Sequence, residues 1–147
     1  MTCAQPFSSF DKWKAAIISG LFFALLSSSC FYKWTDAVTQ SIGMRTSFNG
    51  CPNLAGLFIN ALLYIIVIRV IMQFGNSANC GSSKDKWVIS VIGGILFLII
   101  ASPFLYETVN TICSSMGLST AVDGCPNPAG ITIHTILFIL MVRILMR

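Results

Sequence analysis

Two arginines lie where a charge is costly. Arg69 and Arg143 occur in otherwise apolar stretches, four residues before the ends of two matching segments. A charge near the centre of a membrane costs at least about 2.5–3.5 kcal/mol, so an arginine there can mark a path for ions or substrate. One turn from a helix end, the same side chain can reach the headgroups. Because Asp11 and Asp85 are expected at the same level, we predict two structural Asp–Arg ion pairs, each joining the two helices of one unit.

His134 is the single histidine, and it lies in the middle of an apolar stretch where the matching segment has Asn60. A histidine within a membrane can relay protons. No Asp, Glu or second histidine stands at helical spacing from it. We therefore favour a hydrogen bond between helices as its role.

The six cysteines raise the question of disulfides and metal binding. Cys51 and Cys125 occupy matching positions in the two segments. No pair of cysteines has the spacing of a zinc site, and one histidine adds too few ligands, so we expect no metal. A disulfide between Cys51 and Cys125 and free cysteines in a reducing compartment are both compatible with the sequence.

Motifs of catalysis are missing from the sequence. The chain has no glycine-rich phosphate loop, no Gly-x-Ser-x-Gly, no His-Glu-x-x-His and no pair of acids that could share a membrane cavity. A potassium-filter signature is also missing. We therefore expect no catalytic residues and no cofactor.

The composition indicates a membrane protein. Apolar residues make up 55% of the chain and charged residues 10%, whereas a soluble domain carries about 25% charged residues. Uncharged stretches of 18, 23, 20 and 19 residues cover 15–32, 46–68, 87–106 and 124–142. About 20 helical residues cross a bilayer core. We predict an all-α fold, an integral membrane four-helix bundle. The lysines and arginines are scattered, which argues against nucleic acid as a partner.

The chain contains an internal repeat. Residues 11–73 align without a gap with residues 85–147 after a shift of 74, and about a third of the 63 pairs are identical. We predict an N-terminal segment at 1–10, a first transmembrane hairpin at 11–73, a linker at 74–84 and a second hairpin at 85–147. Two helices per unit return the chain to its starting side, so both units should have the same orientation.

A four-residue motif precedes the second helix of each unit. It reads Gly50-Cys51-Pro52-Asn53 in the first unit and Gly124-Cys125-Pro126-Asn127 in the second. The asparagines stand where a helix N-cap is expected, so we interpret the motif as a helix entry. It closes the two predicted polar loops, residues 33–50 and 107–124.

The charges differ between the two ends of the predicted bundle. Lysines and arginines gather at the termini and linker, whereas the two loops hold two basic and three acidic residues. The positive-inside rule then places the termini and linker on the cytoplasm-equivalent side. We expect Trp13 and Trp87 to mark the membrane interface on that side, and Tyr32 and Tyr106 to mark the other.

Three motifs carry a resemblance to a known family. They are Ser102-Pro103-Phe104-Leu105-Tyr106, Asp123-Gly124-Cys125-Pro126-Asn127 and Met141-Val142-Arg143-Ile144-Leu145-Met146. They resemble small virion membrane proteins of nucleocytoplasmic large DNA viruses, especially those of algae and amoebae. The resemblance covers residues 11–147, and the first unit departs from it with Ser29-Cys30-Phe31. Such viruses enclose a membrane beneath an icosahedral capsid.

The resemblance implies a non-enzymatic minor capsid protein that links the internal membrane of the virion to the shell, and that occupies a host membrane during assembly. The expected partners are the lipid bilayer and other capsid proteins, contacted through loops 33–50 and 107–124; copies of the chain itself are a further candidate. Two other functions stay open: a small oligomeric ion channel or transporter, and a membrane-remodelling assembly factor. A channel calls for a polar stripe at helical spacing, which the sequence lacks.

Overall fold

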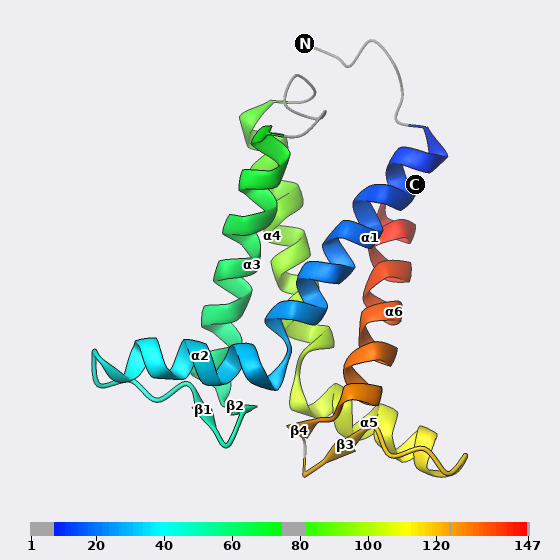
Figure 1. The fold of residues 1–147 in the computed structure, drawn as a ribbon. Helices are drawn as coiled ribbons and strands as arrows, with labels where there is room; N and C mark the ends of the chain where they lie inside the picture. The colour runs from blue at the N-terminus through cyan, green and yellow to red at the C-terminus, as the bar shows by residue number, and fades with distance from the viewer. Residues whose placement is uncertain (1–7, 75–81, 124, 147) are drawn as a thin grey trace.

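The computed structural model describes residues 8–74, 82–123 and 125–146, which are mostly helical (Figure 1). The helices are α1 (Ser9–Leu26), α2 (Ser29–Gln40), α3 (Leu54–Phe74), α4 (Ser83–Ile100), α5 (Pro103–Ser114) and α6 (Pro128–Leu145). Two short antiparallel hairpins pair β1 (Ser47–Phe48) with β2 (Cys51–Pro52), and β3 (Ala121–Val122) with β4 (Cys125–Pro126). The order helix, helix, hairpin, helix thus occurs twice. Most of the predicted linker lies outside the described residues.

Capping boxes begin α1 and α4. The Ser8 hydroxyl accepts the Asp11 N–H at 3.2 Å, and the Asp11 carboxylate accepts the Ser8 N–H at 3.3 Å. Ser82 and Asp85 form the same pair of bonds at the start of α4. Both aspartates therefore satisfy backbone N–H groups that a helix start leaves without partners.

The segments predicted as polar loops each contain a helix, so that prediction is wrong. Ser28 and Ser102 cap new helices by accepting the N–H of Phe31 and Leu105. The chain turns sharply at these points, by 60° between α1 and α2 and by 54° between α4 and α5. Only the hairpins and their flanking turns remain as loops within residues 33–50 and 107–124.

The first hairpin turns at Asn49 and Gly50, whose φ angles are 54° and 87°. Positive φ at both central residues is the geometry of a two-residue turn that matches the twist of paired strands, and Asn-Gly adopts it most readily. Asp123 has a φ of 50° at the matching place in the second hairpin.

Four helices stand side by side, while α2 and α5 project sideways in opposite directions at one end (Figure 1). Each helix packs most closely on a helix of the other repeat, α1 on α6 and α3 on α4. Glycines allow this approach: Gly20 of α1 lies against Ile139 of α6, and Gly94 of α4 against Ile65 of α3.

Four aromatic rings fill the centre of the bundle. Phe23 stacks on Phe138 with ring centroids 4.6 Å apart, and its edge meets Phe97 at 5.2 Å. Tyr64 contacts both Phe97 and Phe138, at 5.4 and 5.7 Å. All four side chains are almost fully buried, and they come from all four long helices.

Two helices, α3 and α6, could each cross a membrane by length and composition, and up to four spans result if each bent pair is counted as one. Charged residues explain why α1 and α4 do not qualify as membrane spans on their own, as α3 and α6 do. Both helices carry three charged residues near their first turn: Asp11, Lys12 and Lys14 in α1, and Lys84, Asp85 and Lys86 in α4.

Candidate functional site

A disulfide joins the two hairpins. Cys51 of β2 and Cys125 of β4 are bonded, with their Cα atoms 5.2 Å apart and 74 positions apart in the sequence. Of the remaining cysteines, Cys30 and Cys113 are free thiols, and Cys3 and Cys80 lie outside the described residues. The bond ties the hairpin ends of the two repeats into one face, which we call the disulfide face: α2, α5 and both hairpins.

The asparagine of each helix-entry motif fixes its loop to the helix that follows. Asn53 Oδ1 accepts the Gly56 N–H at 2.8 Å, and Asn53 Nδ2 donates to the Arg45 carbonyl at 2.8 Å. One amide side chain thereby caps α3 and holds the segment that leads into β1. The second repeat forms the same bonds, from Asn127 to Gly130 and Ser119.

Glycine is required at positions 56 and 130 because the backbone of the preceding loop lies directly against the first turn of each helix. A Cβ on Gly56 would collide with the backbone carbonyl of Thr46, and one on Gly130 with that of Thr120. Both carbonyls also accept the N–H of the motif asparagines. The helix-entry motif is therefore a device that seats each hairpin on the first turn of a long helix.

A side chain on each sideways helix holds the other edge of the hairpin. Asp36 Oδ1 accepts the backbone N–H groups of Thr46 and Ser47, at 2.6 and 3.0 Å. These bonds favour the ionised carboxylate and lower the pKa of Asp36. Asn110 does the same in the second repeat, at 2.7 and 3.1 Å from Thr120 and Ala121. Sequence reasoning missed this pair, although the shift of 74 aligns them.

The two matched polar residues inside the bundle, Asn60 and His134, bind the chain where it bends. Asn60 Nδ2 donates to the carbonyl of Leu26, the last residue of α1, at 3.1 Å. His134 Nδ1 lies 2.8 Å from the carbonyl of Ile100, the last residue of α4. Because a carbonyl only accepts, Nδ1 carries the proton in this bond. The ring of His134 also stacks on Tyr106, with centroids 3.8 Å apart.

Tyr32 and Tyr106 do not mark a membrane interface as predicted. Each is 1% exposed, because α2 and α5 turn them inward against the bundle, and this burial raises the pKa of both hydroxyls. Trp13 and Trp87 are about half exposed near the starts of α1 and α4. Large exposed rings on the disulfide face are those of Trp34, Phe48 and Phe104, at 61%, 69% and 77%.

The predicted ion pairs of Asp11 with Arg69 and of Asp85 with Arg143 are not formed among the described residues. Local capping serines engage both aspartates instead. Each arginine contacts the helix start of the other repeat, and its guanidinium lies 5.5 Å from a tryptophan ring there, Arg69 over Trp87 and Arg143 over Trp13. The accompanying hydrogen bonds run from Arg69 to Ser83 and from Arg143 to Ser9, at 3.0 and 3.2 Å.

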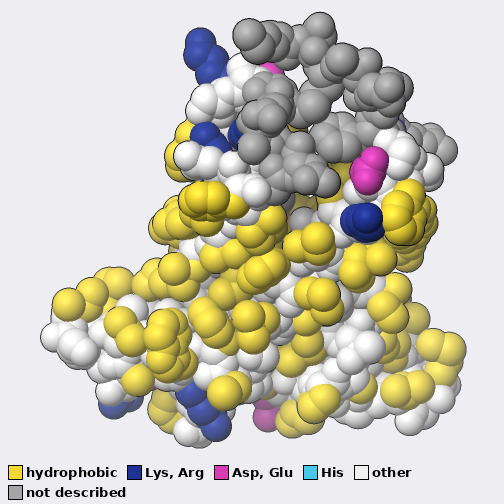
Figure 2. Space-filling view, turned by 45° about the horizontal axis from the view of Figure 1, so that its top comes forward, with side chains coloured by type: hydrophobic (Ala, Val, Ile, Leu, Met, Phe, Trp, Pro, Cys, Tyr) yellow, Lys and Arg dark blue, Asp and Glu magenta, His cyan; other side chains and the backbone are white. Residues whose placement is uncertain are grey.

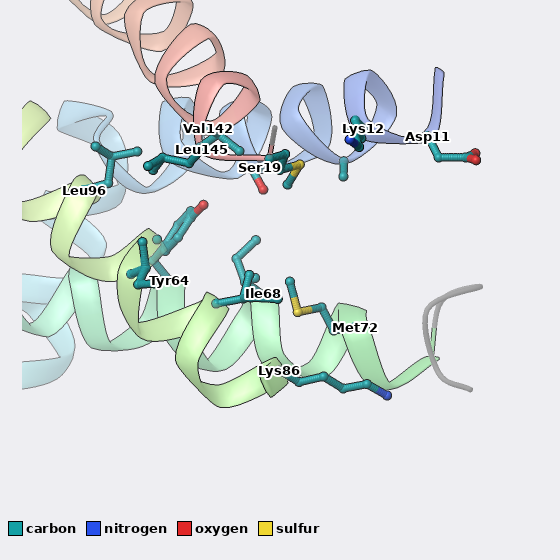
Figure 3. Close-up of a pocket in the computed structure, with 15 residues that line it drawn as sticks. Asp11, Lys12, Ser19, Tyr64, Ile68, Met72, Lys86, Leu96, Val142 and Leu145 are labelled. Atoms are coloured by element: carbon teal, nitrogen blue, oxygen red, sulfur yellow. The ribbon is translucent and has the colours of Figure 1, made fainter. Parts of the chain in front are cut away.

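A cavity of about 410 Å³ opens between the two helix pairs at the end opposite the disulfide face. Figure 3 shows Tyr64 at its inner end, with the hydroxyl directed toward Ser19, while Lys12 and Lys86 lie toward the mouth. Its other walls are mainly aliphatic. No group of three His, Cys, Asp or Glu that could hold a metal ion occurs within residues 8–74, 82–123 and 125–146.

The chain matches no family model, no curated protein and no solved structure. Its class therefore follows from its own geometry. It is a mostly helical protein with two to four helices able to span a membrane, and a disulfide joins its repeated hairpins at one end.

Proposed function

We propose that this chain is a structural membrane protein, a four-span anchor that presents a rigid face on one side of the bilayer. More specifically, we propose a minor capsid protein of a large icosahedral DNA virus that links the internal membrane to the shell. The viral assignment rests on the motif resemblance. The observation that carries the structural role is the disulfide between Cys51 and Cys125, which joins both repeats on one face.

The outer surfaces of the helices support four separate spans. On α3, exposed apolar side chains recur every fourth residue, from Leu54 to Val70, and such a stripe suits lipid. Exposed side chains on α1 and α4 include Leu21, Leu25 and Ile99. At about 1.5 Å per residue, the 18 residues of α1, α4 and α6 each reach about 27 Å, close to the thickness of a bilayer core.

The disulfide face supports a role in binding another protein. Asp36, Asn53 and their counterparts hold each hairpin by hydrogen bonds, so little conformational freedom is lost when a partner docks. The hairpins expose Phe48 and Val122, which are 69% and 61% exposed. These two side chains are the candidate apolar contacts of the shell protein.

The exposed charges on the disulfide face differ in sign between the two repeats. Lys33 and Arg45 are exposed on the first repeat, whereas Glu107 and Asp123 are exposed on the second. Lys33 and Glu107 occupy matching positions, so the same position of the repeat is positively charged in the first unit and negatively charged in the second. A partner with the complementary pair of charges would bind in one orientation.

The bundle centre argues against a channel through a single chain. Four buried rings, Phe23, Tyr64, Phe97 and Phe138, close the axis between the cavity and the disulfide face. His134, the residue considered for proton transfer, has its Nδ1 engaged by a backbone carbonyl. Membrane remodelling by the same anchor remains the second candidate function, because α2 and α5 widen one end of the molecule.

Quantitative mass spectrometry of purified virus particles, before and after detergent removes the membrane, tests the capsid role. We expect a fixed copy number that stays with the shell, and cross-links to a shell protein from Lys33 and Glu107. Matched cross-linking at Lys12 and Lys14, on the opposite end, should give no shell partner. Complete loss of the chain with the lipid contradicts the linker role and makes bilayer conductance the next measurement.

A further inference from the structure

The exposed surface of α2 is divided into an apolar and a polar part. Trp34 and Val38, one turn apart, are 61% and 55% exposed, and the Phe31 ring lies 5.4 Å from that of Trp34. At 3.6 residues per turn these three share one arc. Lys33 and Gln40 occupy the other part of the exposed surface. The helix therefore has three faces: one buried on the hairpin, one apolar and one polar.

The same division occurs on α5. Phe104 and Ile112 are 77% and 61% exposed on the arc that matches Trp34 and Val38. Between them, the hydroxyl of Thr108 donates to the Phe104 carbonyl at 2.8 Å, which satisfies its donor within the helix. Glu107 lies on the polar part, where α2 has Lys33.

The height of α2 on the bundle places this arc within reach of lipid. Asn60 binds both Leu26, at the bend, and the Thr35 hydroxyl of α2, at 3.1 Å each. Asn60 is six residues into α3, about 9 Å from Leu54 along the axis. Leu54 and Phe58 are still 72% and 57% exposed on the outside of α3. The apolar surface of α3 thus continues past the height at which α2 leaves the bundle.

Both helices project across the ends of the spans and not along them, at bends of 60° and 54°. Figure 2 views the molecule obliquely from the end of the termini, and hydrophobic side chains gather over the projection on the left, which contains α2. The surface of α2 seen in this view is turned toward the end of the termini, and therefore toward the level of the spans. A membrane that surrounds the spans would meet this surface directly.

We propose that α2 and α5 are interfacial helices, which lie in the headgroup–acyl boundary of the leaflet on the disulfide side with their apolar arcs against lipid. An amphipathic helix in this position buries its apolar face about 5–10 Å into the boundary. The inference rests on the proposed four-span anchor. It divides the disulfide face: Trp34 faces lipid, whereas Phe48 is left for a protein partner.

Tryptophan fluorescence in vesicles measures the depth of α2. In a full-length protein with Trp13→Phe and Trp87→Phe, Trp34 is the single tryptophan. The protein is reconstituted in phosphatidylcholine vesicles that contain lipids brominated at different depths. We expect the greatest loss of Trp34 fluorescence with bromine high on the acyl chain, and little loss with aqueous iodide. Thr108→Trp, placed in a Trp34→Phe background, should report the same depth for α5.

Two further single-tryptophan proteins separate the outcomes. Ile66→Trp reports the middle of α3 and should be quenched most by deeply placed bromine; if it is not, the membrane anchor itself is wrong. Lys33→Trp reports the polar part of α2 and should be open to iodide. If Ile66→Trp is quenched deeply while Trp34 responds only to iodide, or only to the deepest bromine, the interfacial placement is overturned.

Discussion

At the scale of single residues, Asp36 and Asn110 perform one task with different chemistry. Both accept two backbone N–H groups of their hairpins, but only Asp36 can titrate. Because these bonds lower the pKa of Asp36, its contribution to stability is present above the unfolded pKa of about 4. That contribution is lost as the pH falls through the folded pKa.

We therefore expect Asp36→Asn to fold and to reduce the loss of thermal stability between about pH 5 and about pH 3. Circular dichroism of the purified protein in detergent, at a series of pH values, measures the unfolding midpoint. Asn110→Asp is the matched control and should add an acid-dependent loss in the second repeat. Identical pH profiles for the wild type and Asp36→Asn would contradict the role given to this carboxylate.

His134 and Asn60 form a second matched pair, since His134 binds the carbonyl of the last residue of α4 and Asn60 binds that of the last residue of α1. His134→Asn should keep that bond and change the free energy of unfolding by less than about 1 kcal/mol. His134→Leu should cost about 1–3 kcal/mol, because the Ile100 carbonyl loses its side-chain partner. Thermal unfolding in detergent measures both. A proton-relay role predicts a different result: both variants would lose ion flux in vesicles.

At the scale of elements, the long helices were predictable and the sideways helices were not. Charge spacing located the apolar stretches, because a membrane core demands about 20 uncharged residues. The polarity of residues 33–50 predicts a loop, yet Ser28 caps a helix whose inward face carries Tyr32 and Thr35. The polar residues of α2 hide the helical periodicity of its buried side chains, and this periodicity is understood only once that face is seen to pack against the hairpin.

Local contacts also overrode the predicted ion pairs. Ser8 lies three residues before Asp11 and engages it in a capping box, so the aspartate is held before any distant arginine can compete. The partner of Arg69 depends on how the repeats pack on each other, and no spacing within one repeat encodes that. For the disulfide between Cys51 and Cys125, the sequence leaves two alternatives because it does not reveal whether the compartment is oxidising or reducing.

Because each long helix packs on a helix of the other repeat, we expect each glycine contact to depend on one particular partner helix. Gly94→Val should destabilise the fold because its side chain would meet Ile65 of α3. Adding Ile65→Ala should recover about 0.5–3 kcal/mol, the usual range for coupled neighbours. Ile139→Ala should not rescue Gly94→Val, but should rescue Gly20→Val.

Unfolding of these single and double variants in one detergent measures the coupling. The crossed pairs serve as controls, because they combine the same substitutions without the contact. Equal rescue by Ile65→Ala and Ile139→Ala in both glycine backgrounds would rule out the packing of α1 on α6 and of α3 on α4.

At the scale of the whole molecule, two helix pairs, α1 with α6 and α3 with α4, are joined at the disulfide face and diverge at the other end. Aromatic packing closes the centre of the bundle, and the cavity of about 410 Å³ lies between the helix pairs beyond it. Lys12, Lys86 and Asp11 lie toward the mouth of this open end, and the joined end exposes Lys33, Arg45, Glu107 and Asp123. Such a molecule is narrow on the side of the termini and broad on the other.

The bond between Cys51 and Cys125 should account for much of the cohesion of the broad end. For a free chain, closing a loop of 74 residues restricts the unfolded state by about 4 kcal/mol. If the proposed spans stay inserted, they already restrict that state, so we expect Cys51→Ser to lower the free energy of unfolding by less than this. Cys125→Ser and the double variant should show the same loss, because either substitution removes the whole bond.

Labelling of cysteine thiols tests whether the disulfide is formed and which compartment the hairpins face. Maleimide should modify Cys51 and Cys125 only after reduction, and Cys30→Ser, which removes an exposed free thiol, should leave the unfolding midpoint unchanged. A stable disulfide is typical of an oxidising compartment, and the positive-inside rule predicts that the lysine-rich end lies on the opposite, cytoplasm-equivalent side. If both cysteines react without a reductant in freshly isolated membranes, the bond is not present there. The hairpin face would then lie in a reducing compartment and rely on Asn53, Asp36 and their counterparts alone for its rigidity.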